Sequence, residues 1–405
     1  MEEKDIMALN NHMEPDKKAY LVLADGTVYE GDSFGAEGTA IGEVVFTTGM
    51  TGYQETLTDP SYYGQIAIQT FPLVGNYGIN DTDEESGKVW MNGYIVRDWC
   101  ETPSNFRSQR NLNDFLKEKG VIGLCAIDTR ALTRKIREFG VMNGAVTTAL
   151  EKNADGSYNW EGGSMESLLR QIGDYTIKDA VKNVSCTEGS FYALNTTVPT
   201  DDIKGRTSEA ACKVALFDFG FKRNILRSLH SRGCDVAVVP WDTTLADLKE
   251  LDIDGIMLSN GPGDPAENKE LIANLQEILT GCDIPVLGIC LGHQLTALAM
   301  GGKTEKLKYG HRGANQPVLD VEHDTVYVTS QNHGYAVLGD SLDPAVAKVS
   351  HINVNDGSCE GVLYTRPRTF TVQFHPEASA GPKDTQYLFD RFVENMKAYK
   401  EGKEA

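Results

Sequence analysis

A cysteine between two glycines is the residue of this sequence best suited to covalent chemistry. The run Gly-Ile-Cys-Leu-Gly at 288–292 stands between an apolar stretch at 285–289 and a helical pattern at 294–300. Glycines at both ends allow the tight strand-to-helix turn that lifts a nucleophile out of a sheet. The start of a helix favours thiolate over thiol, and the thiolate is the reactive form. The pattern predicts that Cys290 is a nucleophile, and the alternative is a buried cysteine after a core strand.

A nucleophilic cysteine needs a base, and His375 is the histidine best placed to serve as one. It follows a strand-like run at 369–374 and precedes Pro376 and Glu377. The carboxyl ends of parallel strands meet at one edge of a sheet, so we expect Cys290 and His375 to lie together. Glu377 could orient the imidazole and support the imidazolium, which predicts a Cys-His-Glu triad. The weaker candidates, which lack this combination, are His293, His333 and His351.

An acyl-transfer site also needs hydrogen-bond donors for the oxyanion that develops in the reaction. The backbone N–H of Leu291, directly after the nucleophile, is one such donor. The loop 260–265, Asn-Gly-Pro-Gly-Asp-Pro, follows a strand that ends at Ser259 and could present a second donor, because glycine lets the backbone approach a substrate closely. Alone this loop would be only a turn, but at the end of a neighbouring strand it is a candidate pocket wall.

The first part of the chain alternates short strand-like and helical runs. Residues 20–23 and 27–30 flank an Asp-Gly pair, which is the pattern of a β-hairpin. The remaining runs are strand-like at 43–47, 65–71, 93–96 and 141–149, and helical at 113–119 and 128–139, where Asp128 is the expected N-cap. We therefore predict a smaller mixed α/β domain over 19–150.

Periodic signals weaken over 151–212, which we interpret as a connector. Beyond it, continuous apolar strands alternate with helices. The predicted strands are 214–217, 235–240, 255–259 and 285–289, and the predicted helices are 223–231, 246–251, 268–280 and 294–300. This alternation predicts an α/β domain over 213–398, with an open, mostly parallel sheet flanked by helices.

The charge and the cysteines exclude several classes of function. The 405 residues carry 38 Lys and Arg against 58 Asp and Glu, a formal charge of −20, which is unsuited to general nucleic-acid binding. No apolar run is long enough to span a membrane, and the polar opening 1–18 lacks a secretion signal, so we expect a cytoplasmic protein. The eight cysteines form no Cys-x-x-Cys pair or tight Cys/His cluster, so we expect neither a disulfide framework nor a bound metal.

One phosphate-binding signal fails on inspection. Gly302-Lys303-Thr304 resembles the end of a P-loop, but Ala297 stands where the first glycine belongs, and a helical run precedes the motif where a strand should be. We expect no ATP site and no cofactor in this chain.

Three separated motifs, at 260–265, 288–294 and 375–377, resemble in type and order those of class I (triad) glutamine amidotransferases. The resemblance covers about 213–398. It implies that Cys290 is the nucleophile, His375 the base and Glu377 the carboxylate. The oxyanion amides would come from Gly261 and Leu291. The residues that would border the glutamine pocket are Gly263, Gln294, Asn332, Gly334 and Tyr335.

The N-terminal part narrows this resemblance. Segments 42–55, 58–62 and 127–133 are similar to the small subunits of carbamoyl-phosphate synthetases, so that the likeness spans nearly the whole chain. Amidotransferases of this class that serve anthranilate or GMP synthesis lack such a domain. Two residues depart from the pattern. Gly49 stands where many relatives have a serine near the glutamine, which leaves only a backbone contact there, and Tyr335 stands where many have phenylalanine.

The resemblance implies a glutaminase subunit. L-glutamine would be hydrolysed through a Cys290 thioester, and ammonia would pass through an internal tunnel to a large synthetase subunit. That partner would make carbamoyl phosphate from bicarbonate and ATP for arginine and pyrimidine synthesis, and ATP and Mg²⁺ are expected on it. The alternatives are a thiol hydrolase of related fold, a glutaminase subunit of another synthase, and a scaffold with an inactive pocket. The intact Cys290, His375 and Glu377 argue against the last.

Overall fold

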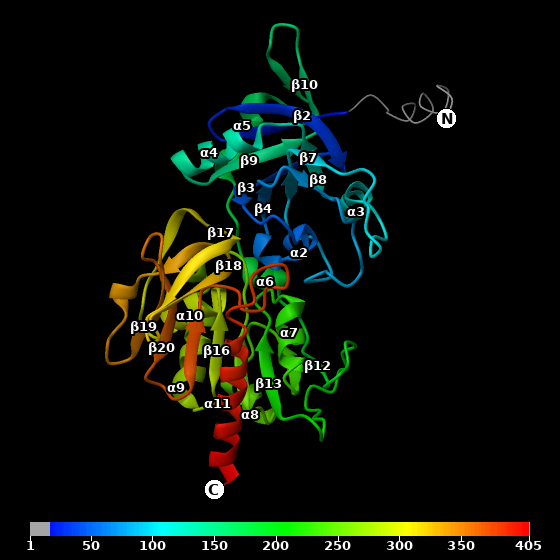
Figure 1. Ribbon diagram of the computed structural model, residues 1–405. Helices are drawn as coiled ribbons and strands as arrows, with labels where there is room; N and C mark the ends of the chain where they lie inside the picture. The colour runs from blue at the N-terminus through cyan, green and yellow to red at the C-terminus, as the bar shows by residue number, and fades with distance from the viewer. Residues whose placement is uncertain (1–16, 405) are drawn as a thin grey trace. The chain divides into compact units, whose positions relative to one another are not determined.

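The computed structural model describes residues 17–404, and the segment 1–16, on which the expectation of no secretion signal falls, lies outside the described residues. The chain divides into two compact units, and Figure 1 labels many of their elements. Unit 1 contains the residues up to Phe46, Gly64–Asp81 and Met91–Thr176. Unit 2 contains Thr47–Tyr63, Thr82–Trp90 and the residues from Ile177 onward. Two short segments from the N-terminal part therefore belong to the same unit as Cys290 and His375.

A closed β-barrel forms unit 1, with its strands in the order β1-β2-β8-β6-β4-β3-β9. The strands are β1 Lys18–Leu23, β2 Val28–Gly35, β3 Thr39–Thr47, β4 Gln65–Gln69, β6 Gly93–Ile95, β8 Ile122–Cys125 and β9 Met142–Thr147. Alternate strand residues such as Leu21, Val44 and Val146 gather in one hydrophobic cluster, because side chains of a strand alternate between two faces. The predicted hairpin is confirmed, since β1 pairs antiparallel with β2.

Both predicted helices of unit 1 are confirmed, and each has an N-cap. In α3 (Leu112–Lys119) the Asn111 side chain accepts from the N–H of Asp114, and in α4 (Thr129–Phe139) the Asp128 side chain accepts from the N–H of Ala131. Such caps satisfy backbone donors that have no partner in the first turn. The other elements of this unit are β5 Leu73–Val74, β7 Asp98–Trp99, β10 Leu150–Lys152, β11 Tyr158–Trp160 and α5 Met165–Asp174.

Unit 2 is built on a mixed sheet in the order β12-β14-β13-β15-β16-β21-β20-β18-β17-β19. The central strands, which pair in parallel, are β14 Cys234–Val239, β13 Cys212–Phe217, β15 Gly255–Leu258, β16 Val286–Ile289 and β21 Thr369–Val372. The flanking antiparallel strands are β12 Ser190–Tyr192, β17 Thr304–Asp320, β18 Thr325–Val337, β19 Ala347–Asn353 and β20 Cys359–Tyr364.

The sequence predicted an open, mostly parallel sheet. This is correct for the five central strands, but the strands at one end are antiparallel and are not open. Strand β19 also pairs with β20, so the strands β20, β18, β17 and β19 close on themselves at one end. The long strands β17 and β18 are only partly buried, with mixed polar and apolar residues. Their residues form no continuous apolar run of the kind that predicted the parallel strands, so β17 and β18 were not predicted from the sequence.

Helices cover both faces of the parallel centre. They are α7 Arg223–His230, α8 Leu245–Glu250, α9 Lys269–Gly281, α10 Leu291–Ala299 and α11 Tyr387–Glu404. Val214 and Leu216 of β13 pack in one cluster with α7 and α11, the red helix of Figure 1. Ala215 and Phe217 pack in the other cluster with α8, α9 and α10. The continuous apolar run of β13 is explained by burial on both faces.

The remaining short elements of unit 2 are α2 Tyr53–Thr58, η1 Pro60–Tyr62, α6 Ala180–Val184, η2 Pro265–Glu267 and η3 Gly339–Ser341. Within residues 17–404, no helix has both the length and the apolar composition that crossing a bilayer requires.

Candidate active site

Cys290 stands at the sharp turn between β16 and α10, as predicted. Its φ of 52° and ψ of −102° are a costly conformation for a residue with a side chain. Two hydrogen bonds hold the turn, because the Cys290 N–H donates to Val372 O (2.9 Å) and the Cys290 carbonyl accepts from Gln294 N (3.1 Å). Glycine is required beside it, since a β-carbon at Gly292 would lie 2.3 Å from Leu258 O.

His375 and Glu377 follow β21, the parallel neighbour of β16. Ile289 pairs with Val372 in these strands, so Cys290 and His375 lie beyond the same edge of the sheet. His375 Nδ1 lies 2.7 Å from Glu377 Oε1, and both side chains are buried. A carboxylate only accepts hydrogen bonds, so Nδ1 carries the proton and donates. The other ring nitrogen, Nε2, is buried and has no hydrogen-bond partner among the described residues, which leaves its lone pair ready for a proton.

Burial dominates the pKa of the Cys290 thiol. The residue is 2% exposed, and burial raises the pKa of its thiol to about 12, while the positive charge of Lys222 and the Leu291 N–H act in the opposite direction. The expectation that the helix start favours the thiolate is therefore not met in this site, because burying a charge costs more than the dipole returns. Cys290 begins as a thiol and depends on a base to remove its proton.

Lys222 joins the carboxylate of Glu377 to a second acidic side chain. Its Nζ lies 2.9 Å from Glu377 Oε1 and 3.9 Å from Asp59 Oδ2. Burial alone would raise the pKa of Glu377, but Lys222 and His375 lower that pKa to about 2. Glu377 is therefore a carboxylate at neutral pH and can hold an imidazolium.

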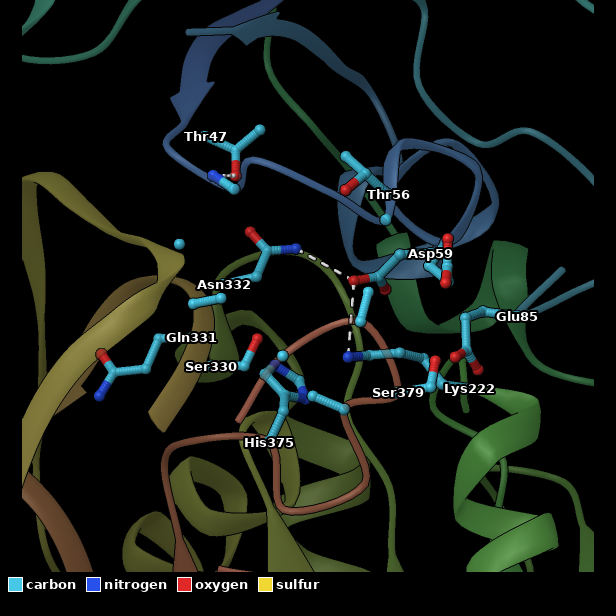
Figure 2. A pocket seen from close by; sticks show the side chains of 18 of the residues that line it. Thr47, Thr56, Asp59, Glu85, Lys222, Ser330, Gln331, Asn332, His375 and Ser379 are labelled. Carbon is cyan, nitrogen blue, oxygen red and sulfur yellow. Dashed lines mark hydrogen bonds and ion pairs between the residues drawn. The ribbon is translucent and has the colours of Figure 1, made fainter. Parts of the chain in front are cut away.

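A chain of polar contacts surrounds the pocket of Figure 2. Asn332 Nδ2 donates to Asp59 Oδ2 (3.2 Å), and the Cys290 thiol donates to Asn332 O (3.7 Å). Asp59 thus bridges Asn332 and Lys222, as the dashed lines in Figure 2 show. The pocket is also lined by His375, Gly49 and Glu85. Polar contacts therefore link Cys290 to His375 around this pocket, in addition to the pairing of the strands β16 and β21.

The predicted oxyanion residues lie together at the start of α10. A β-carbon at Gly261 would lie 2.1 Å from Phe219 O and 2.7 Å from Leu291 Cδ2, so only glycine permits this approach. Gly263, with φ 89°, lies in the same loop against Ala180. The backbone of the loop is thereby held next to Leu291, which follows the proposed nucleophile.

The other predicted glutamine-binding residues fall into two groups. Gln294 Nε2 donates to Tyr335 O (2.7 Å), which places Gln294 next to the end of β18 that carries Gly334 and Asn332. Gly49 lines the pocket of Figure 2 together with Asn332. That these residues bind glutamine stays a prediction.

The three weaker histidine candidates have other partners. His293 Nδ1 lies 2.8 Å from Thr371 Oγ1, His351 Nδ1 lies 2.9 Å from Ser350 Oγ, and His333 Nδ1 lies 2.7 Å from Tyr335 O. Burial lowers the pKa of His293 to about 3 and that of His351 to about 4. Neither of these two side chains is suited to hold a proton at neutral pH.

A small cluster beside β18 has the residue types of a metal site. Donor atoms of His311, His333 and Glu360 lie within 4.8 Å of one another. His311 Nε2, however, lies 2.8 Å from Asp356 Oδ2, and Glu360 accepts a hydrogen bond of 2.9 Å from Gln331 Nε2. These hydrogen bonds account for the cluster without an ion.

Sequence reasoning missed Lys222, Asp59 and Glu85 as members of this site. Lys222 follows the carboxyl end of β13 and caps α7, so the rule that located His375 could also have located it. Asp59 and Glu85 come from the two N-terminal segments that belong to unit 2. The resemblance had placed Gly49, in the first of these segments, near the glutamine, but no pattern in the sequence indicated that Asp59 or the segment Thr82–Trp90 belongs to the site.

Family models and known relatives match this chain over most of its length. The family model "Glutamine amidotransferase class-I" matches residues 215–395, and "Carbamoyl-phosphate synthase small chain, CPSase domain" matches residues 21–146. The carbamoyl phosphate synthase small chain of Syntrophotalea carbinolica is 47% identical over 379 residues, which cover 94% of this chain and 98% of the relative. The small chain of Bacillus thuringiensis subsp. konkukian is 48% identical over 390 residues, which cover 96% and 98%. Among solved structures, a putative GMP synthase protein from Thermoplasma acidophilum aligns with 48% of this chain and 98% of its own, at 22% identity and a TM-score of 0.43.

The C-terminal part of the chain is thus an α/β glutamine amidotransferase domain of class I, which confirms the predicted class. With both family models in order and such relatives over nearly the whole length, the chain belongs to the family of carbamoyl-phosphate synthase small chains.

Proposed function

We propose that this chain hydrolyses glutamine at Cys290 and supplies ammonia for carbamoyl phosphate synthesis. The observation that carries the proposal is how the two ring nitrogens of His375 are placed. Its Nδ1 is fixed by Glu377, its Nε2 is buried with no hydrogen-bond partner among the described residues, and it lies beyond the same sheet edge as Cys290. A thiol and an acceptor nitrogen that both lie beyond one edge of the sheet can serve as the cysteine and histidine pair of nucleophilic catalysis.

In the first half of the reaction, His375 Nε2 takes the proton of the Cys290 thiol. The sulfur attacks the carbon of the side-chain amide of glutamine, and the N–H groups of Leu291 and Gly261 hold the oxyanion. The imidazolium, held by Glu377, then gives its proton to the departing nitrogen. Ammonia leaves, and a glutamyl thioester remains on Cys290.

In the second half, water replaces ammonia. His375 Nε2 removes a proton from the water as it attacks the thioester carbon, and the proton returns to sulfur when the C–S bond breaks. Glutamate is released and Cys290 is again a thiol. The same three side chains therefore serve both halves, as expected for a triad.

Family membership implies a partner. The proposed partner is the large chain of the synthase, which would use the ammonia with bicarbonate and ATP, and Mg²⁺ and ATP would bind there. Service to arginine and pyrimidine synthesis and a cytoplasmic location belong to the same proposal.

A Cys290→Ser variant tests the proposal in the complex with the large chain. Glutamine-dependent synthesis should fall by at least about 10³-fold, because a serine hydroxyl is a poor nucleophile here. Synthesis from added ammonium chloride should stay at the wild-type rate. Equal loss of both activities would mean that Cys290 serves folding or assembly. If the wild-type chain released no ammonia from glutamine but cleaved peptides or other amides, a thiol hydrolase would replace this proposal.

A further inference from the structure

Gln373 is a buried polar residue that the proposed reaction steps do not use. It directly follows β21 and stands two residues before His375. Its backbone N–H donates to Glu360 O at 2.9 Å, which holds the main chain against β20. The side chain is buried, and its Nε2 donates to none of the residues that the structure describes. The contact that remains is Gln373 Oε1, which accepts from Gln294 Nε2 at 2.9 Å.

Strand β21 meets the first turn of α10 through two polar contacts. Side chains of a strand alternate between its two faces, and Val372 packs in the cluster with α7 and α11. Thr371 and Gln373 face α10 instead. Thr371 Oγ1 lies 2.8 Å from His293 Nδ1, next to the contact between Gln373 and Gln294. Of the two residues that α10 contributes, only Gln294 is predicted to bind glutamine.

Two acceptors fix the amide of Gln294. An amide nitrogen carries two hydrogens, and Gln294 Nε2 donates to Tyr335 O at 2.7 Å and to Gln373 Oε1 at 2.9 Å. One acceptor would leave the amide free to turn about that contact, whereas two define its plane. Gln294 Oε1 accepts no hydrogen bond from the residues that the structure describes, so it is an acceptor that points in a fixed direction.

Gln294 lies beside the proposed nucleophile. Its N–H donates to the Cys290 carbonyl at 3.1 Å, so one helical turn separates the two residues. Both side chains also reach the same strand, because the Cys290 thiol donates to Asn332 O and Gln294 Nε2 donates to Tyr335 O, and both carbonyls belong to β18. A substrate bound at the sulfur of Cys290 is therefore next to Gln294.

We propose that Gln373 is a positioning residue, which fixes the amide of Gln294 so that Gln294 Oε1 accepts a hydrogen bond from a nitrogen of the bound glutamine. This inference rests on the proposed glutaminase activity. Glutamine has two nitrogens that can donate, the α-ammonium group and the side-chain amide. An acceptor that is ordered before the substrate arrives improves binding, because binding then costs less conformational entropy.

The test is the steady-state kinetics of ammonia release from glutamine by the full chain mixed with the large chain. In Gln373→Met the KM for glutamine should rise about tenfold with kcat within about threefold of wild type, because the lost contact orders a binding group and no reacting atom. The matched control is Thr371→Val, which removes the other polar contact between β21 and α10. Its KM should stay within about twofold of wild type.

A double variant separates positioning from packing. Gln294→Met should itself raise KM, and adding Gln373→Met to it should change KM by no more than about twofold, because the amide that Gln373 positions is gone. A further rise in the double variant, as large as that in Gln373→Met alone, would overturn the inference. A rise of the same size in Thr371→Val would also overturn it, since joining β21 to α10 would then be what matters.

Gln373→Asn keeps the test decisive if Gln373→Met does not fold. Its amide is one methylene shorter and falls short of Gln294, so it should show the same rise in KM. A lower kcat with unchanged KM, or a lower Tm with wild-type kinetics, would leave Gln373 a structural residue and overturn the inference. Failure of the wild-type mixture to release ammonia from glutamine would instead overturn the proposed function.

Discussion

His375 Nδ1 lies 2.7 Å from Glu377 Oε1, in a place where neither side chain is more than 1% exposed. The pair is two residues apart in sequence, with Pro376 between them. Glu377 thus fixes the ring tautomer, and the fixed tautomer directs the lone pair of Nε2 away from the carboxylate. Because the site is buried, this single contact orients the base and also stabilises its charged form.

Glu377→Gln should separate two roles of Glu377, which are to orient the His375 ring and to stabilise the charged imidazolium. The amide keeps the size and can still accept from Nδ1, but it cannot neutralise the imidazolium, so kcat for glutamine hydrolysis should fall by about 10²-fold or more. Steady-state kinetics with ammonia detection measures this change. Glu250→Gln, which alters an exposed carboxylate paired with Lys204, is the control and should behave as wild type. A Glu377→Gln variant with full kcat would remove Glu377 from the catalytic group.

The parallel strands and the turn at Cys290 could be predicted from the sequence, because each is encoded by a few neighbouring residues. The apolar runs of β13, β15 and β16 and the glycines around Cys290 encode burial on both faces and a sharp turn. His375 could be paired with Cys290 across 85 residues because each stands directly after such a run, although the pairing of β16 with β21 is known only from the structure.

The parts that could not be predicted depend on long-range packing. Asp59 and Glu85 lie in two N-terminal segments that belong to the unit of the amidotransferase domain, and only Gly49 of the first segment was placed near the site, by resemblance. Likewise, the closure of β19 on β20 follows from hydrogen bonding between strands far from the parallel centre. The raised pKa of Cys290 was also missed, because burial outweighs the helix start only once the surrounding residues are in place.

The free energy of unfolding should fall as Glu85 ionises with rising pH. Burial raises the pKa of Glu85 from 4.5 to about 7, while Lys222 and the Asn224 N–H act in the opposite direction. A raised folded-state pKa means that the contribution to stability is fully present below pH 4.5 and is lost as the pH rises through 7. Glu85→Gln resembles the protonated form at every pH. Its free energy of unfolding should therefore equal that of wild type near pH 4.5 and exceed it by up to about 3 kcal/mol above pH 7.

Urea unfolding of both proteins between about pH 4.5 and 8 measures this difference. The comparison is between two proteins at each pH, so the titration of groups that do not interact with Glu85 cancels. A constant difference across the range would show that Glu85 titrates near its ordinary pKa in the folded chain.

The turn around Cys290 should not tolerate a side chain at Gly292. A β-carbon there would lie 2.3 Å from the backbone oxygen of Leu258, which β15 holds in place. Gly292→Ala should lower the free energy of unfolding by about 1–3 kcal/mol and also lower kcat, because the turn must shift. Gly173→Ala in α5, where nothing lies within 4 Å of the new carbon, should be neutral or stabilising. Gly292→Ala with wild-type stability and kcat would mean that the approach to β15 is looser than described.

Glutamine turnover by the isolated chain should be slow and should rise when the large chain binds. The buried Cys290 thiol resists ionisation. Asn332 and Asp59 join the Cys290 thiol to Lys222 through a chain of polar contacts. A partner that shifts the segment carrying Asp59 would change this chain of contacts, and coupling between sites typically changes binding affinity by about 5- to 150-fold. Titrating the large chain into wild-type chain while following ammonia measures the effect, with Cys290→Ser as the control for contaminating glutaminase. Unchanged turnover at saturating large chain would show that the two active sites are not coupled.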